Sequence, residues 1–149
     1  MRAVVQRVKR AEVRVEGQTI GRIGPGVLVL VAIAKDDTRE TGKLLAERIV
    51  RLRIFNDDRG RMNRDLREAG GAALVVSEFT LYGDCRKGRR PSYLQAAPPD
   101  EARPLYHAFA QSIAAMGVKV ETGEFQATMD VELTNDGPVT LLLDSDRAF

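Results

Sequence analysis

The stretch AEVRVEGQTIGRIGPGVLVLVAIA, residues 11–34, holds the pattern that decides the fold. Its first residues alternate apolar and charged side chains, which is typical of a strand with one buried face. A turn at Gly17-Gln18 then leads into a second short strand over residues 19–23, so we expect a β-hairpin. After a break at residues 24–26, residues 27–34 are all apolar and predict a strand covered on both faces.

Two helices are expected further along the chain. Asp37 followed by Glu40 fits a capping box, and apolar residues continue at helical spacing until the pattern fades near Arg53. A second helix is predicted over residues 100–116, with the glycine that follows it as the stop. Pro104 fits this helix only if it falls in the first turn, where the backbone N–H groups are unpaired anyway.

Three further stretches predict strands. Residues 73–81 are strand-like, and residues 125–133 alternate apolar and polar side chains more regularly than any other part of the chain. The turn Asn135-Asp136-Gly137-Pro138 separates them from residues 139–143, which we expect to form a buried strand. Residues 82–99 form a long polar segment without helical or strand periodicity.

The composition is that of one globular domain. With 149 residues, of which 44% are hydrophobic, the chain can bury a core without disulfide staples. Its single cysteine, Cys85, allows no disulfide within the chain, which agrees with a reducing compartment. The N-terminus shows no signal-peptide pattern, and the longest apolar run is too short to cross a bilayer. We expect a cytoplasmic α/β protein with one compact, strand-rich domain over residues 1–149 and two main helices.

The side chains needed for several common chemistries are scarce. His107 is the only histidine, and it lies within the second predicted helix rather than beside a nucleophile. One cysteine and one histidine do not make a zinc site, so we expect no metal. The glycines at residues 21–26 precede a strand, whereas phosphate-binding loops precede a helix, so no nucleotide cofactor is expected. If the chain is an enzyme, its active groups are mostly hydroxyls and backbone amides.

Two short motifs have that character. Ser77-Glu78-Phe79-Thr80-Leu81 ends an apolar strand, and Asn135-Asp136-Gly137-Pro138-Val139-Thr140 forms a turn between two strands. Each alone is common, but with the rest of the chain they resemble the D-aminoacyl-tRNA deacylase (D-tyrosyl-tRNA deacylase) family from end to end. The other blocks that carry the resemblance are MRAVVQRV (1–8), GRIGPG (21–26), LRIF (52–55), RKG (86–88), RPS (90–92), APP (97–99) and LLLDS (141–145).

The resemblance implies a compact α/β fold, with a mixed or antiparallel, barrel-like sheet, that works as a homodimer. It also implies hydrolysis of the ester between a D-amino acid, or mischarged glycine, and the terminal adenosine of tRNA. By resemblance, the Phe79 amide is an oxyanion donor, and Ser77 and Thr80 shape the same catalytic site. The sequence places no base beside Thr80, so we favour attack by water, assisted by the terminal ribose hydroxyl.

The resemblance also assigns substrate-binding residues. In the family the Gly137-Pro138 bond is cis, and the pair reaches into the partner subunit's active site, where its carbonyls reject L-aminoacyl groups. Arg7 occupies the position that holds this Gly-Pro loop in orientation. Glu78 departs from the family, which usually has glutamine there. An ionised carboxylate accepts hydrogen bonds only, so it would favour the substrate ammonium or repel tRNA phosphates, depending on which it faces.

A basic cluster lies in the polar segment. The net charge of the chain is only +2, which is not the balance of a general nucleic-acid binder, so local clusters matter more. The resemblance makes Arg86, Lys87, Arg89 and Arg90 phosphate contacts for the acceptor end of tRNA, although a solvated surface loop has the same composition. Two alternatives stay open: a non-catalytic tRNA- or RNA-binding dimer of the same fold, and a hydrolase of some other ester.

Overall fold

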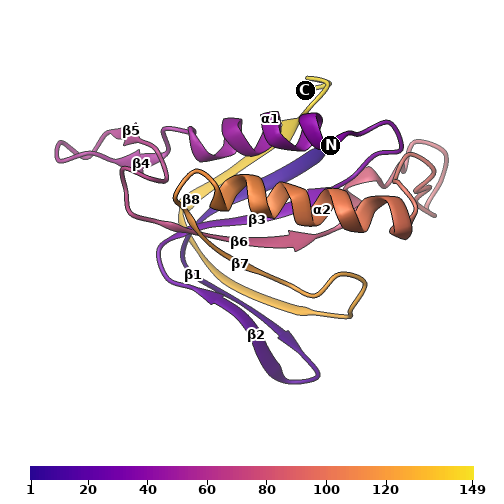
Figure 1. The fold of residues 1–149 in the computed structure, drawn as a ribbon, viewed down its shortest axis with the longest axis horizontal. Coiled ribbons are helices and arrows are strands. Elements are labelled where there is room, and N and C mark those ends of the chain that lie inside the picture. The colour runs from indigo at the N-terminus through magenta and orange to yellow at the C-terminus, as the bar shows by residue number, and fades with distance from the viewer.

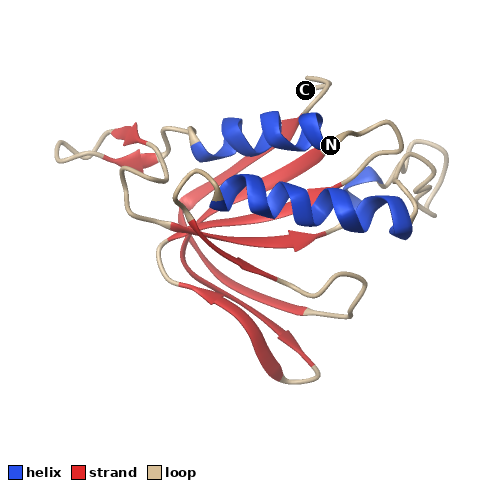
Figure 2. Cartoon of the chain, in the orientation of Figure 1, coloured by secondary structure: helices blue, strands red, loops and turns tan.

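The computed structural model describes residues 1–149, which form a mixed sheet with two helices over one face (Figure 1 and Figure 2). In chain order the elements are β1 (Arg2–Val15), β2 (Gln18–Ile23), β3 (Gly26–Ala32), α1 (Arg39–Val50), β4 (Phe55–Asn56), β5 (Met62–Arg64), β6 (Ala72–Ser77), the 3-10 helix η1 (Phe79–Tyr82), α2 (Pro99–Ala114), β7 (Lys119–Thr122) and β8 (Asp130–Asp144).

The strand pairing makes the sheet both mixed and strongly curved. β1 pairs antiparallel with β3 through its first half and with β2 through its second half, while β8 follows its other edge. β3, β6 and β7 run parallel to one another. In Figure 1 the second half of β1 bends away from the helices together with β2 and the first half of β8. The predicted fold class is therefore confirmed: a strand-rich α/β domain with a mixed, barrel-like sheet and two main helices.

The predicted hairpin and the buried strand are both present. Val15 pairs with Gln18, so the turn is formed by Glu16 and Gly17, one position earlier than predicted. Both turn residues have positive φ angles, 50° and 79°, which suits the twist of a two-residue hairpin. β3 is buried on both faces except for the half-exposed Leu30, because the helices cover one face and the curled sheet covers the other.

Helix α1 begins one residue later than its predicted capping box. Thr38 is the N-cap, and its hydroxyl accepts from the Thr41 N–H while the Thr41 hydroxyl accepts from the Thr38 N–H. Asp37 instead accepts from the Ala34 N–H at 2.6 Å and from the Met1 ammonium at 2.7 Å. The helix ends at Val50, before the predicted limit.

Helix α2 covers the centre of the sheet. Its buried stripe includes Tyr106, Phe109 and Ile113, as the helical spacing predicts. The expectation for Pro104 was wrong, because this residue lies beyond the first turn, inside the helix. Its side chain is exposed, so the ring has room there. No helix in the structure is both long enough and apolar enough to cross a membrane.

Two strand predictions were wrong, one after Ser77 and one before Asp130. β6 ends at Ser77, and the next turn of chain is the 3-10 helix η1 rather than a continued strand. Residues 123–129 form a loop, and the strand predicted over residues 125–133 begins only at Asp130. In this loop Gln126 has a φ of 67°, a left-handed conformation that a continuous strand does not allow.

The Asn135–Pro138 turn proved to be a bulge within one long strand. β8 runs through it, with Asn135 opposite Val8 and Thr140 opposite Gln6. The four residues between these pairs bulge out opposite the single residue Arg7. The strand after the bulge is not buried as predicted, since Leu142 is 62% exposed and only its last residues are covered.

Candidate active site

The edge of the sheet where β3 and β6 end holds a cavity of about 720 Å³. Parallel strands end at the same edge, and Val31 of β3 pairs with Ser77 of β6 there. Loops at such an edge are where open α/β sheets commonly bind ligands. The lining residues come from β3, from β6 and η1, from the segment before α2 and its first turn, and from the region between β7 and β8: Val31, Ala32, Ile33, Val76, Ser77, Glu78, Phe79, Thr80, Tyr93, Ala96, Ala97, Pro99, Ala102, Phe125, Gln126, Ala127, Met129 and Val131.

The predicted catalytic motif lines this cavity as a single turn of chain. The Glu78 N–H donates to the Val31 carbonyl at 2.8 Å, which fixes the point where β6 ends. Phe79 is the first residue of η1, so its N–H has no acceptor within that helix. Phe79 is 57% exposed, and its ring meets the Tyr93 ring edge-on, with 5.1 Å between the ring centroids. The structure thus brings Ser77, Phe79 and Thr80 together, as predicted from the motif.

Glu78 holds the Thr80 hydroxyl. Thr80 Oγ1 donates to Glu78 Oε1 at 2.8 Å, so a potential base does lie beside Thr80, contrary to what the sequence suggested. Glu78 is the residue before η1, and Thr80 lies within it, so the turn of the chain brings their side chains together. In a continued strand the two side chains would stand side by side on one face of the sheet. No salt bridge involves Glu78.

Arg7 and the Gly-Pro bulge form a second constellation. The buried Arg7 side chain donates from Nε to the Asp136 carbonyl at 3.1 Å and from Nη1 to the Ile54 carbonyl at 2.5 Å. The Gly137-Pro138 bond is cis, and Gly137 has a φ of 126°. A Cβ on Gly137 would lie 3.0 Å from Arg7 Nη2, so only glycine fits comfortably against the guanidinium.

The bulge is also closed from within. Asn135 Oδ1 accepts from the Val139 N–H at 2.9 Å, across the base of the bulge. Gly137 and Pro138 are both exposed, and neither lines the cavity of its own chain. Within one chain, therefore, the structure does not bring the Gly-Pro pair to the Ser77 motif.

The basic cluster divides into one engaged residue and three free ones. Arg86 donates to both carboxylate oxygens of Asp84, at 2.9 and 2.7 Å, and its own N–H binds the same group. These bonds from Arg86 hold the pKa of Asp84 well below its usual range. Lys87, Arg89 and Arg90 are exposed and take part in no salt bridge. None of the four lines the cavity, although their loop directly follows η1.

Sequence reasoning missed the wall of the cavity that faces the motif. Phe125 and Gln126 form part of it, and both are fixed by Arg103 of α2. Arg103 Nη2 donates to Gln126 Oε1 at 2.6 Å, and its guanidinium lies 4.8 Å from the centre of the Phe125 ring. Phe125 also packs against the buried Tyr106. The alternation over residues 125–133 concealed this loop, and no local signal marks it.

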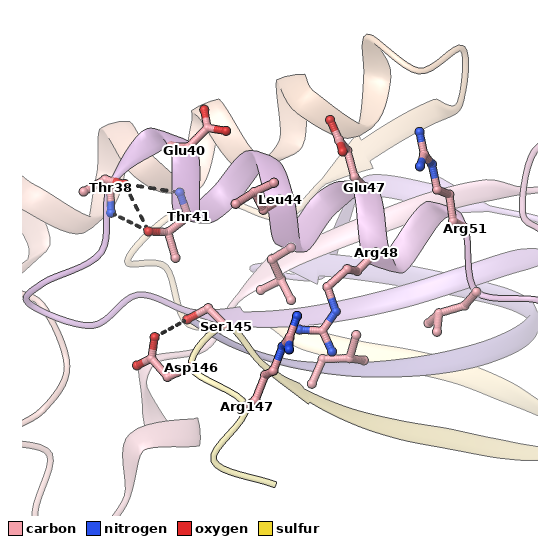
Figure 3. Close-up of a pocket in the computed structure, with 13 residues that line it drawn as sticks. Thr38, Glu40, Thr41, Leu44, Glu47, Arg48, Arg51, Ser145, Asp146 and Arg147 are labelled. Atoms are coloured by element: carbon pink, nitrogen blue, oxygen red, sulfur yellow. Dashed lines mark hydrogen bonds between the residues drawn. The ribbon is translucent and has the colours of Figure 1, made fainter.

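A second cavity, of about 740 Å³, lies between α1 and the C-terminal residues (Figure 3). Figure 3 shows Arg48 and Arg147 reaching into the same space, while Glu47 points away from them. Arg48 is partly engaged, because it donates to the Asp144 carbonyl at 3.2 Å. No residue predicted to be functional lines this cavity, so the first cavity is the candidate active site.

Comparison with known proteins identifies the family of this chain. Residues 4–144 match the protein family described as D-Tyr-tRNA(Tyr) deacylase. The chain is 59% identical to the D-aminoacyl-tRNA deacylase of Thermosipho africanus, over 100% of both chains. It is 57% identical to that of Thermus aquaticus, over 97% of this chain and 95% of the relative. Among solved structures, the c-Myc DNA Unwinding Element Binding Protein has a TM-score of 0.91 at 36% identity, with 97% of this chain and 98% of the other covered.

A probable eukaryotic D-amino acid tRNA deacylase has the same fold, with a TM-score of 0.82 at 21% identity, over 95% of this chain and 97% of the other. The match to the family extends over both motifs and over nearly all of the chain. The chain therefore belongs to the D-Tyr-tRNA(Tyr) deacylase family.

Proposed function

We propose that this chain is a hydrolase that cleaves the ester joining a D-amino acid, or mischarged glycine, to the terminal adenosine of tRNA. Such a reaction is a chirality proofreading step in translation. The observation that carries the proposal is the cavity at the end of β6, in which Ser77, Phe79 and Thr80 converge. Family membership supports it, because the full-length relatives are named D-aminoacyl-tRNA deacylases.

The chemistry needs orientation more than a strong nucleophile, because an aminoacyl ester is already activated compared with an amide. The Phe79 N–H at the start of η1 faces no helical acceptor, so it is suited to bind the developing oxyanion. Ser77 and Thr80 shape the site around the ester carbonyl. Water attacks that carbonyl, and the neighbouring hydroxyl of the terminal ribose assists, because the site holds the ester and the ribose in a fixed orientation.

Selection against L-amino acids is assigned to the Gly-Pro bulge of a second copy of the chain. Gly137 and Pro138 protrude from β8 and lie outside the cavity of their own chain, which supports a role in the partner's site. Main-chain carbonyls can exclude one configuration at the α-carbon without contacting the amino-acid side chain, which suits an enzyme that must accept many amino acids. Arg7 is the positioning residue, because it holds the Asp136 carbonyl at the base of the bulge.

The tRNA acceptor end is assigned to the loop after η1. Lys87, Arg89 and Arg90 are the free cations of that loop and would contact phosphates, while Arg86 mainly shapes the turn through Asp84. Aminoacyl-tRNA is a cytoplasmic substrate, so the protein is placed in the cytoplasm by this proposal.

The competing function is a tRNA-binding dimer without activity. The complete Ser77-to-Thr80 turn and its cavity favour the enzyme instead. The deciding experiment incubates the purified protein with D-tyrosyl-tRNA and measures the tyrosine released. Release well above the spontaneous rate supports the hydrolase. Tight binding of tRNA without any release contradicts it, and light scattering at the same protein concentration tests the dimer.

A further inference from the structure

Residues 51–64, which follow α1 and form the β4–β5 hairpin, are strongly basic. They hold five arginines and two aspartates, a net charge of +3, whereas the net charge of the whole chain is only +2. This tract is therefore a local concentration of positive charge on a chain that is otherwise slightly acidic. A solvated surface hairpin has the same composition, so the pairing of these charges decides whether they can bind a partner.

Both aspartates of the tract are used within the hairpin. Asp57 Oδ1 accepts from the N–H groups of Arg59 at 2.9 Å and Arg61 at 3.0 Å, so this carboxylate builds the turn. Asp58 pairs with Arg64 at 2.8 Å. The other arginines of the tract form no salt bridge: Arg51, Arg53, Arg59 and Arg61. Arg59 and Arg61 are exposed and contribute only main-chain groups to the turn, so both guanidinium groups are free to bind an anion.

The hairpin is held firmly at its base. Phe55 packs against the main hydrophobic core, and the Leu66 N–H donates to the Val50 carbonyl at the end of α1 at 3.2 Å. Arg53 Nε crosses the hairpin and donates to the Asn63 carbonyl at 2.8 Å. These contacts present the free arginines on a fixed framework, so less conformational entropy is lost when a ligand binds.

The hairpin lies far from the basic loop of its own chain but is attached to the Gly-Pro bulge. In Figure 1 it projects beyond the last turn of α1, whereas the pink loop after η1 lies at the opposite end of the molecule. Arg7 donates from Nη1 to the Ile54 carbonyl at 2.5 Å and from Nε to the Asp136 carbonyl at 3.1 Å. One buried side chain thus holds the start of the hairpin and the bulge together.

We infer that the β4–β5 hairpin binds the phosphate backbone of RNA whose 3′ end lies in the active site of the partner subunit. The inference rests on the proposed function, in which the bulge of one chain enters the cavity of the other, because Arg7 attaches the hairpin to that bulge. Guanidinium groups match phosphate geometry with paired, charge-assisted hydrogen bonds. The cavity takes the single-stranded end, so the hairpin contacts the duplex behind it, and proteins bind RNA duplexes largely through the backbone.

The double variant Arg59→Met/Arg61→Met tests the contact with RNA. Each lost phosphate contact lowers the slope of log affinity against log salt concentration by about 0.7–0.9, so we expect a decrease of about 1.4–1.8 for tRNA. The Kd for tRNA at low salt should rise about tenfold. Hydrolysis of D-tyrosyl-adenosine, which carries the same ester without the RNA, should be unchanged. An unchanged Kd and slope would overturn the inference and leave the proposed hydrolase intact, whereas failure of the native protein to cleave D-tyrosyl-tRNA would overturn the proposed function.

The matched control is Arg39→Met/Lys43→Met. It removes two exposed cations that form no salt bridge, from the end of α1 away from the hairpin, and should leave the Kd for tRNA unchanged. An equal rise in Kd for both double variants would reduce the effect to net charge and contradict the inference.

Mixed dimers test whether the hairpin acts on the substrate of the partner. One chain carries Arg59→Met/Arg61→Met, and the other carries Ala127→Trp, which fills the cavity that Ala127 lines and removes its turnover. The only open cavity then belongs to the chain with the altered hairpin. We expect the mixed dimer to show the native KM for D-tyrosyl-tRNA, because the partner supplies an intact hairpin. A KM as high as that of the dimer with two altered hairpins would place the contact within one chain and overturn the inference.

Discussion

Replacing Arg7 by methionine tests how the Gly-Pro bulge is held. Methionine keeps an unbranched stem in the buried position but removes the guanidinium and its bonds to Ile54 and Asp136. A buried Ile54 carbonyl left without a donor costs about 1–3 kcal/mol. The bond to the Asp136 carbonyl adds about 1 kcal/mol. The ion pair with the Asp136 carboxylate, which is 41% exposed, adds less than about 1 kcal/mol. We expect the free energy of unfolding to fall by about 2–5 kcal/mol.

The measurement is urea unfolding followed by circular dichroism, at one fixed protein concentration because dimerisation would make stability concentration-dependent. The control is Arg10→Met, which removes an ion pair to Glu132 from a side chain that is 60% exposed and is expected to cost less than about 1 kcal/mol. In the same samples, the Arg7 variant should lose selectivity for D- over L-aminoacyl-tRNA because the bulge is no longer held. If the two variants were equally stable and equally selective, Arg7 would not be the residue that positions the bulge.

Three further outcomes are expected. Thr80→Val keeps the shape of the site and removes the hydroxyl that bonds to Glu78, and we expect most of the deacylation rate to remain in a single-turnover assay. Complete loss of that rate would mean that the Thr80 hydroxyl is the nucleophile or an essential proton carrier. Hydrogen bonds from Thr19, and then from Arg22 and Arg14, lower the pKa of Glu12 to about 2, so its contribution to stability is present above its ordinary pKa and is lost as the pH falls toward about 2. Acid unfolding of Glu12→Gln should therefore depend less on pH in that window, and an unchanged acid transition would argue against the Glu12 cluster. Lys87→Met should reduce the slope of log affinity for tRNA against log salt concentration by about 0.7–0.9. Arg86→Met should reduce this slope less, because Asp84 already binds the Arg86 guanidinium. Equal changes in slope for the two variants would contradict this division of the loop.

The elements that could be predicted from the sequence depend on near neighbours along the chain. The hairpin follows from the alternation and from the glycine turn, although the turn lies at Glu16-Gly17 rather than at the predicted Gly17-Gln18, and α2 follows from its helical spacing. The Ser77 motif was located because its residues are contiguous, so a single turn of chain carries them all into one cavity. Local chemistry was sufficient in each of these cases.

The parts that could not be predicted depend on contacts between residues far apart in the sequence. The turn at Glu78 is fixed by a carbonyl of β3, and the loop of Phe125 and Gln126 is held by Arg103 of α2. The alternation over residues 125–133 satisfies a strand pattern equally well, but in the structure Phe125 packs on Tyr106 outside the sheet. Tertiary packing overrode the local pattern at the wall of the site.

The central claim is that the cavity beside Ser77 cleaves aminoacyl esters of the D series and that the Gly-Pro bulge rejects the L series. The most direct measurement is the ratio of kcat/KM for D-tyrosyl-tRNA to that for L-tyrosyl-tRNA, using the same tRNA and the purified protein. We expect release of D-tyrosine to be faster by a factor on the order of 100 or more, the scale of steric and polar rejection in a fitted site. Equal rates for the two esters would contradict the account.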